Sequence, residues 1–245
     1  MINSEFSNQF DTMLNSYASS AMFGEETTKQ TVALDEYEKS LFLTKAQEEI
    51  VLSLYNGKNP YREPFEVTEE LRRYLSSLVM EADLTPSVDA STPLPVASIT
   101  NSFFFTLPSD LWFIILEQVS VNKGKCGSAI LNVYPIKHDE YLSIKNNPFR
   151  GANSRRALRL DVRDKEVEII CKYPVVAYFV RFLKKLSPII LVDLPDNLSI
   201  NGISKATECK VHETLHQRIL ERAVALALQS KGYSTQRDNN SNNNR

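Results

Sequence analysis

The residues with the most direct chemical potential form the run His212-Glu213-Thr214-Leu215-His216. This run matches the HExxH pattern, in which two histidines one helical turn apart bind zinc and the glutamate activates a water molecule. The extended pattern lacks its third ligand, because Ile219 and Arg222 stand where glycine and histidine are expected. A capping box of Thr214 and Gln217 would also start a helix that leaves His212 outside it. We therefore predict no catalytic, metal-binding or cofactor-binding residue, and a zinc-dependent hydrolase stays as an alternative.

A second group is a cluster of arginines within fourteen residues: Arg150, Arg155, Arg156, Arg159 and Arg163. Such a cluster suits contacts with nucleic-acid phosphates. Aromatic residues interleaved for base stacking are absent, since only Phe149 is near. The cluster also runs directly into acidic residues, namely Asp161, Asp164, Glu166 and Glu168. Mixed charges on a strand pair are typical of ion pairs across strands or between subunits. A solvated face, a contact with a protein partner and a nucleic-acid-binding module all stay open.

Composition narrows the classes of function. The chain has 245 residues, is 42% hydrophobic and carries a net charge of −2, which argues against a general affinity for nucleic acid or anionic membranes. The sequence has neither a membrane-length apolar run nor the features of a secretory signal at its start. Three cysteines without close pairing suggest a reducing, cytoplasmic place of synthesis. Seven glycines and no phosphate-binding glycine motif argue against common nucleotide enzymes and a small-molecule substrate.

The element with the clearest start and stop signals is a helix over residues 34–57. Asp35 and Glu38 can form a capping box, and Asn56-Gly57 supplies a stop. The helix has two apolar sides. One consists of Leu43, Ala46, Ile50 and Leu54, and the other of Tyr37, Leu41, Leu52 and Tyr55. The second set is expected either in the core or in a subunit interface.

Other helices flank this one. Residues 4–18 place aromatic residues at helical spacing, which predicts an amphipathic helix that docks outside the chain's own core. Thr68 is expected to start a second long helix, and residues 214–231 to form a closing helix that ends at Gly232.

The middle of the chain has a β pattern. Short apolar runs separated by turn residues predict strands at 103–105, 111–121, 129–136 and 175–183, with a hairpin over 156–170 that turns at Arg163–Lys165. We predict an α+β fold, in which N-terminal helices (two of them long) and a C-terminal helix pack together, with an antiparallel β-sandwich or barrel domain between them in the chain. The expected boundaries are an N-terminal helical region over residues 1–82, a linker over 83–99, a β domain over 100–207, a closing helix over 208–233 and a disordered tail over 234–245.

Three segments resemble one known pattern: LDEYEKSLFLTKAQEEIV at 34–51, DEYLSIKNNPFRGANSRRALRL at 139–160 and ECKVHETLHQRILERAVALAL at 208–228. They are similar to segments of the virion neck and tail ring proteins of crAss-like bacteriophages, in the same order, and the resemblance spans about residues 34–231. This chain departs from the family pattern at His212, where a proline or another residue that does not bind metal is expected ahead of the closing helix. The HETLH run is therefore interpreted as an accident of sequence.

The resemblance implies a structural ring subunit of the portal–neck–tail assembly of a short-tailed phage, similar in architecture to head–tail adaptor or tail tubular proteins. It implies a homo-oligomeric, dodecameric ring around the DNA channel, with adjacent portal, adaptor or tail ring proteins as partners and non-specific contact with genomic DNA. Assembly would occur in the bacterial host cytoplasm, and the finished protein would lie in the virion. The arginine cluster and Tyr37, Leu41, Leu52 and Tyr55 are the expected subunit-interface residues.

Overall fold

The computed structural model describes residues 1–21, 33–58, 62–87, 102–144, 147–195 and 197–231. The chain divides into two compact units, a helical unit of residues 1–78 with 186–245 and a half-barrel of residues 79–185. The sequence had placed these boundaries near residues 82 and 207, so the segment 186–207 belongs with the helices instead. The expected tail and most of the expected linker lie outside the described residues.

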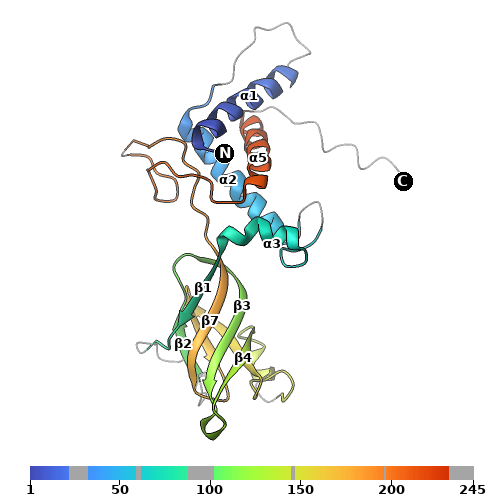
Figure 1. The fold of residues 1–245 in the computed structure, drawn as a ribbon, viewed down its shortest axis with the longest axis vertical. Coiled ribbons are helices and arrows are strands. Elements are labelled where there is room, and N and C mark those ends of the chain that lie inside the picture. The colour runs from blue at the N-terminus through green and yellow to red at the C-terminus, as the bar shows by residue number, and fades with distance from the viewer. Residues whose placement is uncertain (22–32, 59–61, 88–101, 145–146, 196, 232–245) are drawn as a thin grey trace, which may run out of the picture. The chain divides into compact units, whose positions relative to one another are not determined.

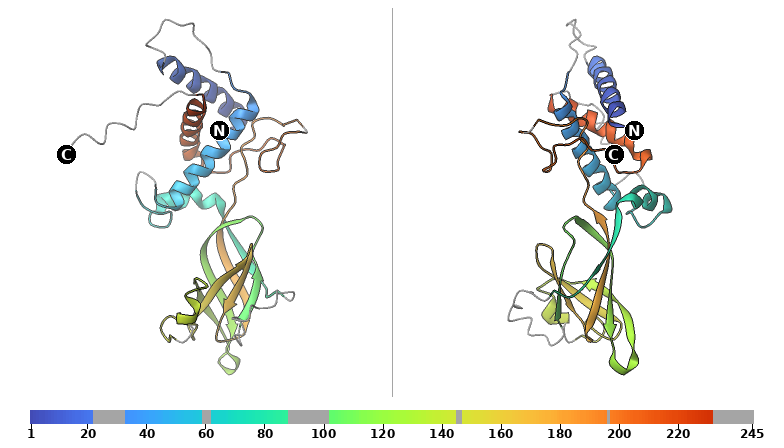
Figure 2. Two further views of the ribbon diagram at one scale, coloured as in Figure 1. Left: turned by 180° about the vertical axis from the view of Figure 1, so that it is seen from behind. Right: turned by 60° about the vertical axis from the view of Figure 1, so that its left-hand side comes forward.

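The helical unit contains α1 (Asn3–Ala21), α2 (Glu36–Tyr55), α3 (Glu69–Leu75) and α5 (His216–Ser230). The predicted capping box starts α2: Asp35 accepts a hydrogen bond from the backbone of Glu38 at 2.7 Å, and Glu38 accepts one from the backbone of Asp35 at 3.3 Å. Both α1 and α2 pack against α5 (Figures 1 and 2). None of the helices in the described ranges combines the length and apolar character needed to cross a membrane.

The expectation that the N-terminal helix docks outside the chain's own core is wrong. Phe6, Phe10 and Leu14 are fully buried within the helical unit, and α1 contacts both α2 and α5. The apolar stripe of α1 therefore already has a partner in the same chain.

The second long helix expected after Thr68 is also wrong. Thr68 does cap α3, accepting a hydrogen bond from the backbone of Leu71 at 3.3 Å, but α3 has only seven residues. A 3₁₀ turn at Ser76–Leu78 and strand β1 (Val79–Leu84) follow it. The backbone of β1 pairs antiparallel with β7 along its whole length, and these sheet hydrogen bonds replace a longer helix.

The half-barrel is a curled sheet of seven strands in the order β1-β7-β3-β4-β5-β6-β2. Besides β1, its strands are β2 (Ser102–Thr106), β3 (Leu111–Asn122), β4 (Ser128–Pro135), β5 (Arg156–Arg163), β6 (Glu166–Ile170) and β7 (Val175–Lys184). Neighbouring strands run antiparallel except β4 and β5, which are parallel. The predicted hairpin is confirmed as β5 and β6, and Lys165 in its turn adopts a φ of 62°.

Apolar residues fill the inner side of the curled sheet, with Val119, Ile169 and Val180 among them. A smaller cluster covers the outer side of β5 and β6, where the short helix α4 (Tyr141–Ile144) packs on Leu158 and Leu160. Strand β5 is therefore buried on both sides, while the outer faces of β1, β7 and β3 stay open.

Candidate assembly surfaces

A polar stripe on α2 holds an extended segment, residues 187–191, in the helical unit. The hydroxyl of Ser40 accepts a hydrogen bond from the N–H of Leu191 at 3.0 Å, and the hydroxyl of Thr44 accepts one from the N–H of Ile189 at 3.0 Å. Gln47 donates to the carbonyl of Ser187 at 3.1 Å. These three side chains satisfy alternate backbone groups of a segment that is about 140 residues away in the chain, so one side of α2 is polar and buried.

The second apolar side of α2 is only partly covered. Tyr37 packs against a cluster of Ile190, Leu194 and Ile200, and Tyr55 stacks on Phe65 with ring centroids 6.5 Å apart. Leu52 is half-buried, whereas Leu41 is 45% exposed. Of the four α2 residues expected at a subunit interface, Leu41 is thus the one classed as exposed.

The two histidines of the HExxH-like run have different surroundings. His212 is exposed and precedes a 3₁₀ turn, Glu213–Leu215, with its Nδ1 3.0 Å from the hydroxyl of Thr214. His216 is buried at the first position of α5, against the ring of Phe6. His212 therefore lies outside α5, as the expected helix start at Thr214 implies, whereas His216 is the first residue of α5 and is buried.

Both nitrogens of His216 have partners. Nε2 lies 3.0 Å from the carbonyl oxygen of Val211, which can only accept, so Nε2 carries the proton. Nδ1 lies 2.8 Å from the amino group of Met1. Burial lowers the pKa of His216, and the positive charge of the N-terminus lowers it further. This imidazole is a neutral packing and capping group, with no nitrogen left to bind a metal.

The arginine cluster does not act as one patch, because successive residues of β5 point to opposite sides of the sheet. Arg159 points to the inner side, where its Nη1 lies 2.6 Å from Glu117 of β3. The hydroxyl of Tyr178 on β7 donates to the other carboxylate oxygen of Glu117, also at 2.6 Å. Asp161 lies 3.1 Å from Nε of Arg159. The result is a buried ionic triad of Glu117, Arg159 and Tyr178 that joins three strands.

The pKa shifts of the triad reflect its burial. Burial raises the pKa of Glu117, while Arg159 and Tyr178 act in the opposite direction. Burial together with the neighbouring Glu117 carboxylate raises the pKa of Tyr178. Because one carboxylate oxygen of Glu117 pairs with Arg159 and the other accepts a hydrogen bond from the neutral hydroxyl of Tyr178, the buried charges of Glu117 and Arg159 compensate each other.

The other four arginines lie nearer the surface. Arg156 stacks on Tyr134, with its guanidinium 4.3 Å from the ring centroid, and donates to the carbonyl of Phe149 at 2.9 Å. Arg163 lies 3.9 Å from Glu166. Arg150 and Arg155 are exposed, and no ion pair involves either of them within the described residues. Of the five, these two remain available for a partner.

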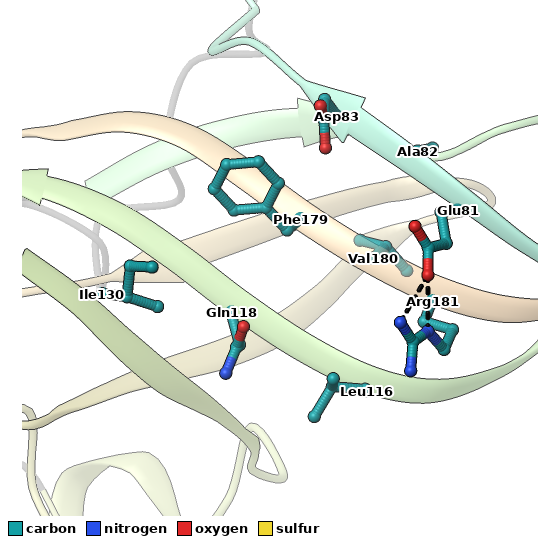
Figure 3. A pocket seen from close by; sticks show the side chains of 9 residues that line it. All are labelled: Glu81, Ala82, Asp83, Leu116, Gln118, Ile130, Phe179, Val180 and Arg181. Atoms are coloured by element: carbon teal, nitrogen blue, oxygen red, sulfur yellow. Dashed lines mark hydrogen bonds and ion pairs between the residues drawn. The ribbon is translucent and has the colours of Figure 1, made fainter.

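A shallow pocket lies on the outer face of the half-barrel, over β1, β7, β3 and β4 (Figure 3). Its volume is about 250 Å³. Leu116, Ile130 and Phe179 give it an apolar floor, and Glu81 and Asp83 place carboxylates on one side. Glu81 pairs with Arg181, whose Nε lies 2.8 Å from the carboxylate.

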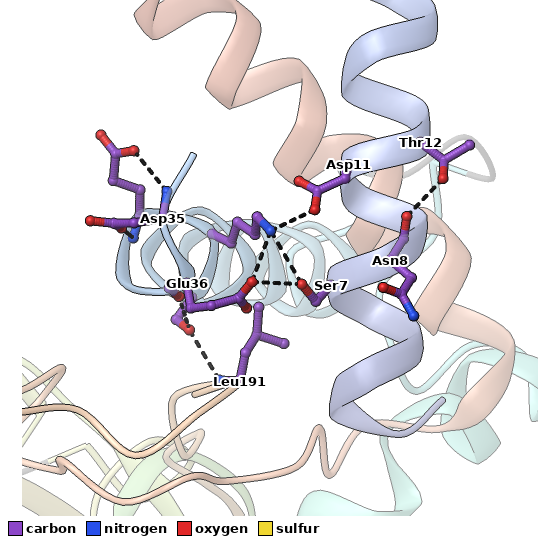
Figure 4. Close-up of polar contacts among 10 residues, drawn as sticks. Ser7, Asn8, Asp11, Thr12, Asp35, Glu36 and Leu191 are labelled. Carbon is purple, nitrogen blue, oxygen red and sulfur yellow. Dashed lines mark hydrogen bonds and ion pairs between the residues drawn. The ribbon is translucent and has the colours of Figure 1, made fainter. Parts of the chain in front are cut away.

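A buried lysine ties α1 to α2 (Figure 4). The amine of Lys39 lies 2.7 Å from Asp11 of α1 and 2.9 Å from Glu36, and it also donates to the hydroxyl of Ser7 at 3.2 Å. Burial lowers the pKa of Lys39, but the two carboxylates outweigh it and the net shift is upward. The amine stays charged and fixes the first helix in place.

Sequence reasoning missed three of these features. The polar stripe was detectable, because Ser40, Thr44 and Gln47 recur at helical spacing between apolar residues. The triad and the pocket had no local signal, since each combines side chains from three or more strands.

Comparisons with known proteins give a consistent result. A family model described as phage tail ring protein 3/4 matches residues 1–239. "Ring protein 3" of Bacteroides phage crAss001 is 43% identical over 235 residues, which cover 94% of this chain and 96% of that protein. "Ring protein 4/5" of the same phage is 30% identical over 232 residues, covering 91% and 90% of the two chains.

Proposed function

Because this chain belongs to the phage tail ring protein 3/4 family, we propose that it forms one closed ring of a portal–neck–tail stack in a crAss-like phage. The observation that carries the proposal is the near-complete coverage of a protein named Ring protein 3 at 43% identity. Homologues with structural names indicate a non-enzymatic virion component, and the zinc-hydrolase alternative loses support because His216 has both nitrogens occupied.

In this proposal copies of the chain stand side by side, twelve to a ring, and enclose the passage for DNA. Each copy needs different surfaces for its two neighbours, because a ring is closed by heterologous contacts. The exposed Leu41 on α2 and the exposed Arg150 and Arg155 of the half-barrel supply such surfaces. Portal, adaptor or other tail ring proteins would contact the ring from above and below.

Contact with genomic DNA would be loose and non-specific. The net charge of −2 gives no general attraction to phosphates. Arg159 and Arg163 have ion pairs and Arg156 is held on Tyr134, which leaves Arg150 and Arg155 as the two of the cluster without such a contact in the described residues. A channel that lets DNA slide has no need for strong phosphate binding, which would resist movement.

Negative-stain electron microscopy and mass photometry of the purified full chain test the ring. The expected result is a closed ring with a central opening, formed by the chain alone or with the phage's other ring proteins. A protein that stays monomeric in all these mixtures, and is absent from purified virions by mass spectrometry, would contradict the proposal.

A further inference from the structure

We infer that neighbouring copies join by inserting Phe149 of one half-barrel into the outer-face pocket of the next. This inference rests on the proposed ring, and it names the two surfaces that meet. The inserting element is the segment 147–155, here called the Phe149 loop, and the receiving surface is the pocket over β1, β7, β3 and β4.

The Phe149 loop is held in one conformation by its own hydrogen bonds. The side chain of Asn147 accepts the N–H groups of Phe149 at 2.9 Å and Arg150 at 3.1 Å, and the backbone N–H of Gly151 donates to the carbonyl of Asn147 at 2.7 Å. Arg156, itself stacked on Tyr134, holds the carbonyl of Phe149. A loop fixed in this way loses little conformational entropy when it binds.

This loop carries an exposed apolar group and two positive charges. Phe149 is 84% exposed, the highest value among the large hydrophobic residues of the described chain. Arg150 and Arg155 are exposed on the same loop and have no ion-pair partner among the described residues. The loop therefore has the composition of an interface anchor, since it combines an aromatic residue with arginines.

The pocket has matching properties. Leu116 is 43% exposed and Ile130 is 65% exposed, so apolar surface lies open beside Phe179. The volume of about 250 Å³ exceeds the roughly 150 Å³ of a cavity that accepts a benzene molecule. The carboxylate of Asp83 lacks a cation partner within the described residues, so it can receive an arginine.

Position and charge favour a second copy over nucleic acid as the occupant. Arg181, which also lines the pocket, already pairs with Glu81, so Asp83 leaves the lining with a net negative charge that repels phosphate but attracts guanidinium. The loop follows β4 and leads into β5, whereas most of the pocket lies across β1, β7 and β3 in the same sheet. Because these are two different surfaces of one chain, their contact is head-to-tail and can repeat around a ring.

Cysteine cross-linking between two separately purified full-length variants, Phe149→Cys and Ile130→Cys, tests the contact. When the two variants are mixed with a short bismaleimide, the yield of covalent dimer should be at least several-fold higher than with either variant alone. The single-variant reactions measure the cross-linking that involves the natural cysteines. Leu142→Cys, also 69% exposed but on α4, is the matched control and should not cross-link with Ile130→Cys. A yield equal to that of the Leu142→Cys control would overturn the inference.

Charge reversal gives a second readout. Asp83→Arg alone and Arg150→Asp alone should each weaken self-association at least about tenfold, and the combined variant should recover most of it. Arg72→Asp, a reversal of an exposed arginine on α3, should have no effect.

The outcomes separate this inference from the proposed function. Rings without the cross-link would overturn the inference and leave the ring intact. A cross-link in open head-to-tail chains would support the contact and contradict a closed ring. If Phe149→Ala with Arg150→Ala abolishes DNA retention but leaves ring assembly unchanged, the loop is a nucleic-acid contact and the inference fails.

Discussion

In the helical unit the buried hydroxyl and amide side chains pair with backbone, whereas in the half-barrel the buried polar groups pair with one another. Ser40, Thr44 and Gln47 bond to the extended segment 187–191, each through a neutral hydrogen bond. Glu117, Arg159 and Tyr178 form a charged triad across three strands. The neutral hydrogen bonds attach an extended segment to α2, whereas the triad joins β3, β5 and β7 inside the half-barrel.

The difference has an energetic consequence. A neutral hydrogen bond contributes about 1 kcal/mol net, and its loss leaves one uncharged group without a partner. Removing one member of a buried ion pair leaves an uncompensated charge, at a cost of about 3–5 kcal/mol. The half-barrel should therefore be the unit more sensitive to a single polar substitution.

The largest expected effect is that of Arg159→Met, which should destabilise the half-barrel by about 3 kcal/mol or more because the buried Glu117 is left without its cation. Urea unfolding followed by the fluorescence of Trp112, the single tryptophan and a residue of β3, measures this unit. Far-ultraviolet circular dichroism reports mainly on the helical unit and should shift less.

A matched variant separates charge from packing. Glu117→Gln combined with Arg159→Met removes both charges and keeps a hydrogen-bonding partner for Tyr178. The double variant should be more stable than Arg159→Met alone. Equal stability of the two variants would show that the triad acts through packing and not through charge.

The next largest effect should come from Thr44→Val in the helical unit. The substitution keeps the shape of the side chain but removes the partner of the buried Ile189 N–H, at a cost of about 2 kcal/mol. Hydrogen exchange of the Ile189 amide should accelerate. Ser53→Ala is the control, because among the described residues its hydroxyl bonds only to Ile50 of the same helix, and an equal loss there would contradict the docking role of Thr44.

Lys39→Met should have a smaller effect, about 1 kcal/mol. Lys39 is buried, but its partners Asp11 and Glu36 are 44% and 35% exposed, so water can solvate them once the amine is gone. The amides of α1 should exchange faster while those of α5 stay protected. Arg73→Ala, which removes an exposed pair with Glu69, should change stability by less than about 0.5 kcal/mol.

The smallest expected effect is a pH dependence from His216. Its folded-state pKa lies below the ordinary value of 6.5, so the unfolded chain takes up a proton in a pH range where the folded chain does not. The free energy of unfolding should therefore fall as the pH drops below 6.5, until the folded-state pKa is reached. His216→Gln should remove this component of the pH profile, and an unchanged profile would rule out the assignment.

Local sequence signals predicted the elements whose contacts are local. The Asp35–Glu38 capping box and the turn before β6 were readable because each depends on residues within a few positions. The resemblance of segments 34–51, 139–160 and 208–228 to crAss-like phage ring proteins also came from the sequence, and the family match confirms it. The α+β class followed from the change in hydrophobic period after residue 100.

Tertiary structure alone decided how distant segments share partners. The helix that begins after Thr68 ends at Leu75 although the sequence could continue it. The reason is that β1 forms a full row of backbone hydrogen bonds with β7, about 100 residues away in the chain. Only the sheet, in which β5 lies between β4 and β6, separates the buried Arg159 from the four arginines nearer the surface. Sequence spacing sets which residues can share a turn or a strand face, whereas the choice among distant partners depends on burial and charge, which exist only once the chain has folded.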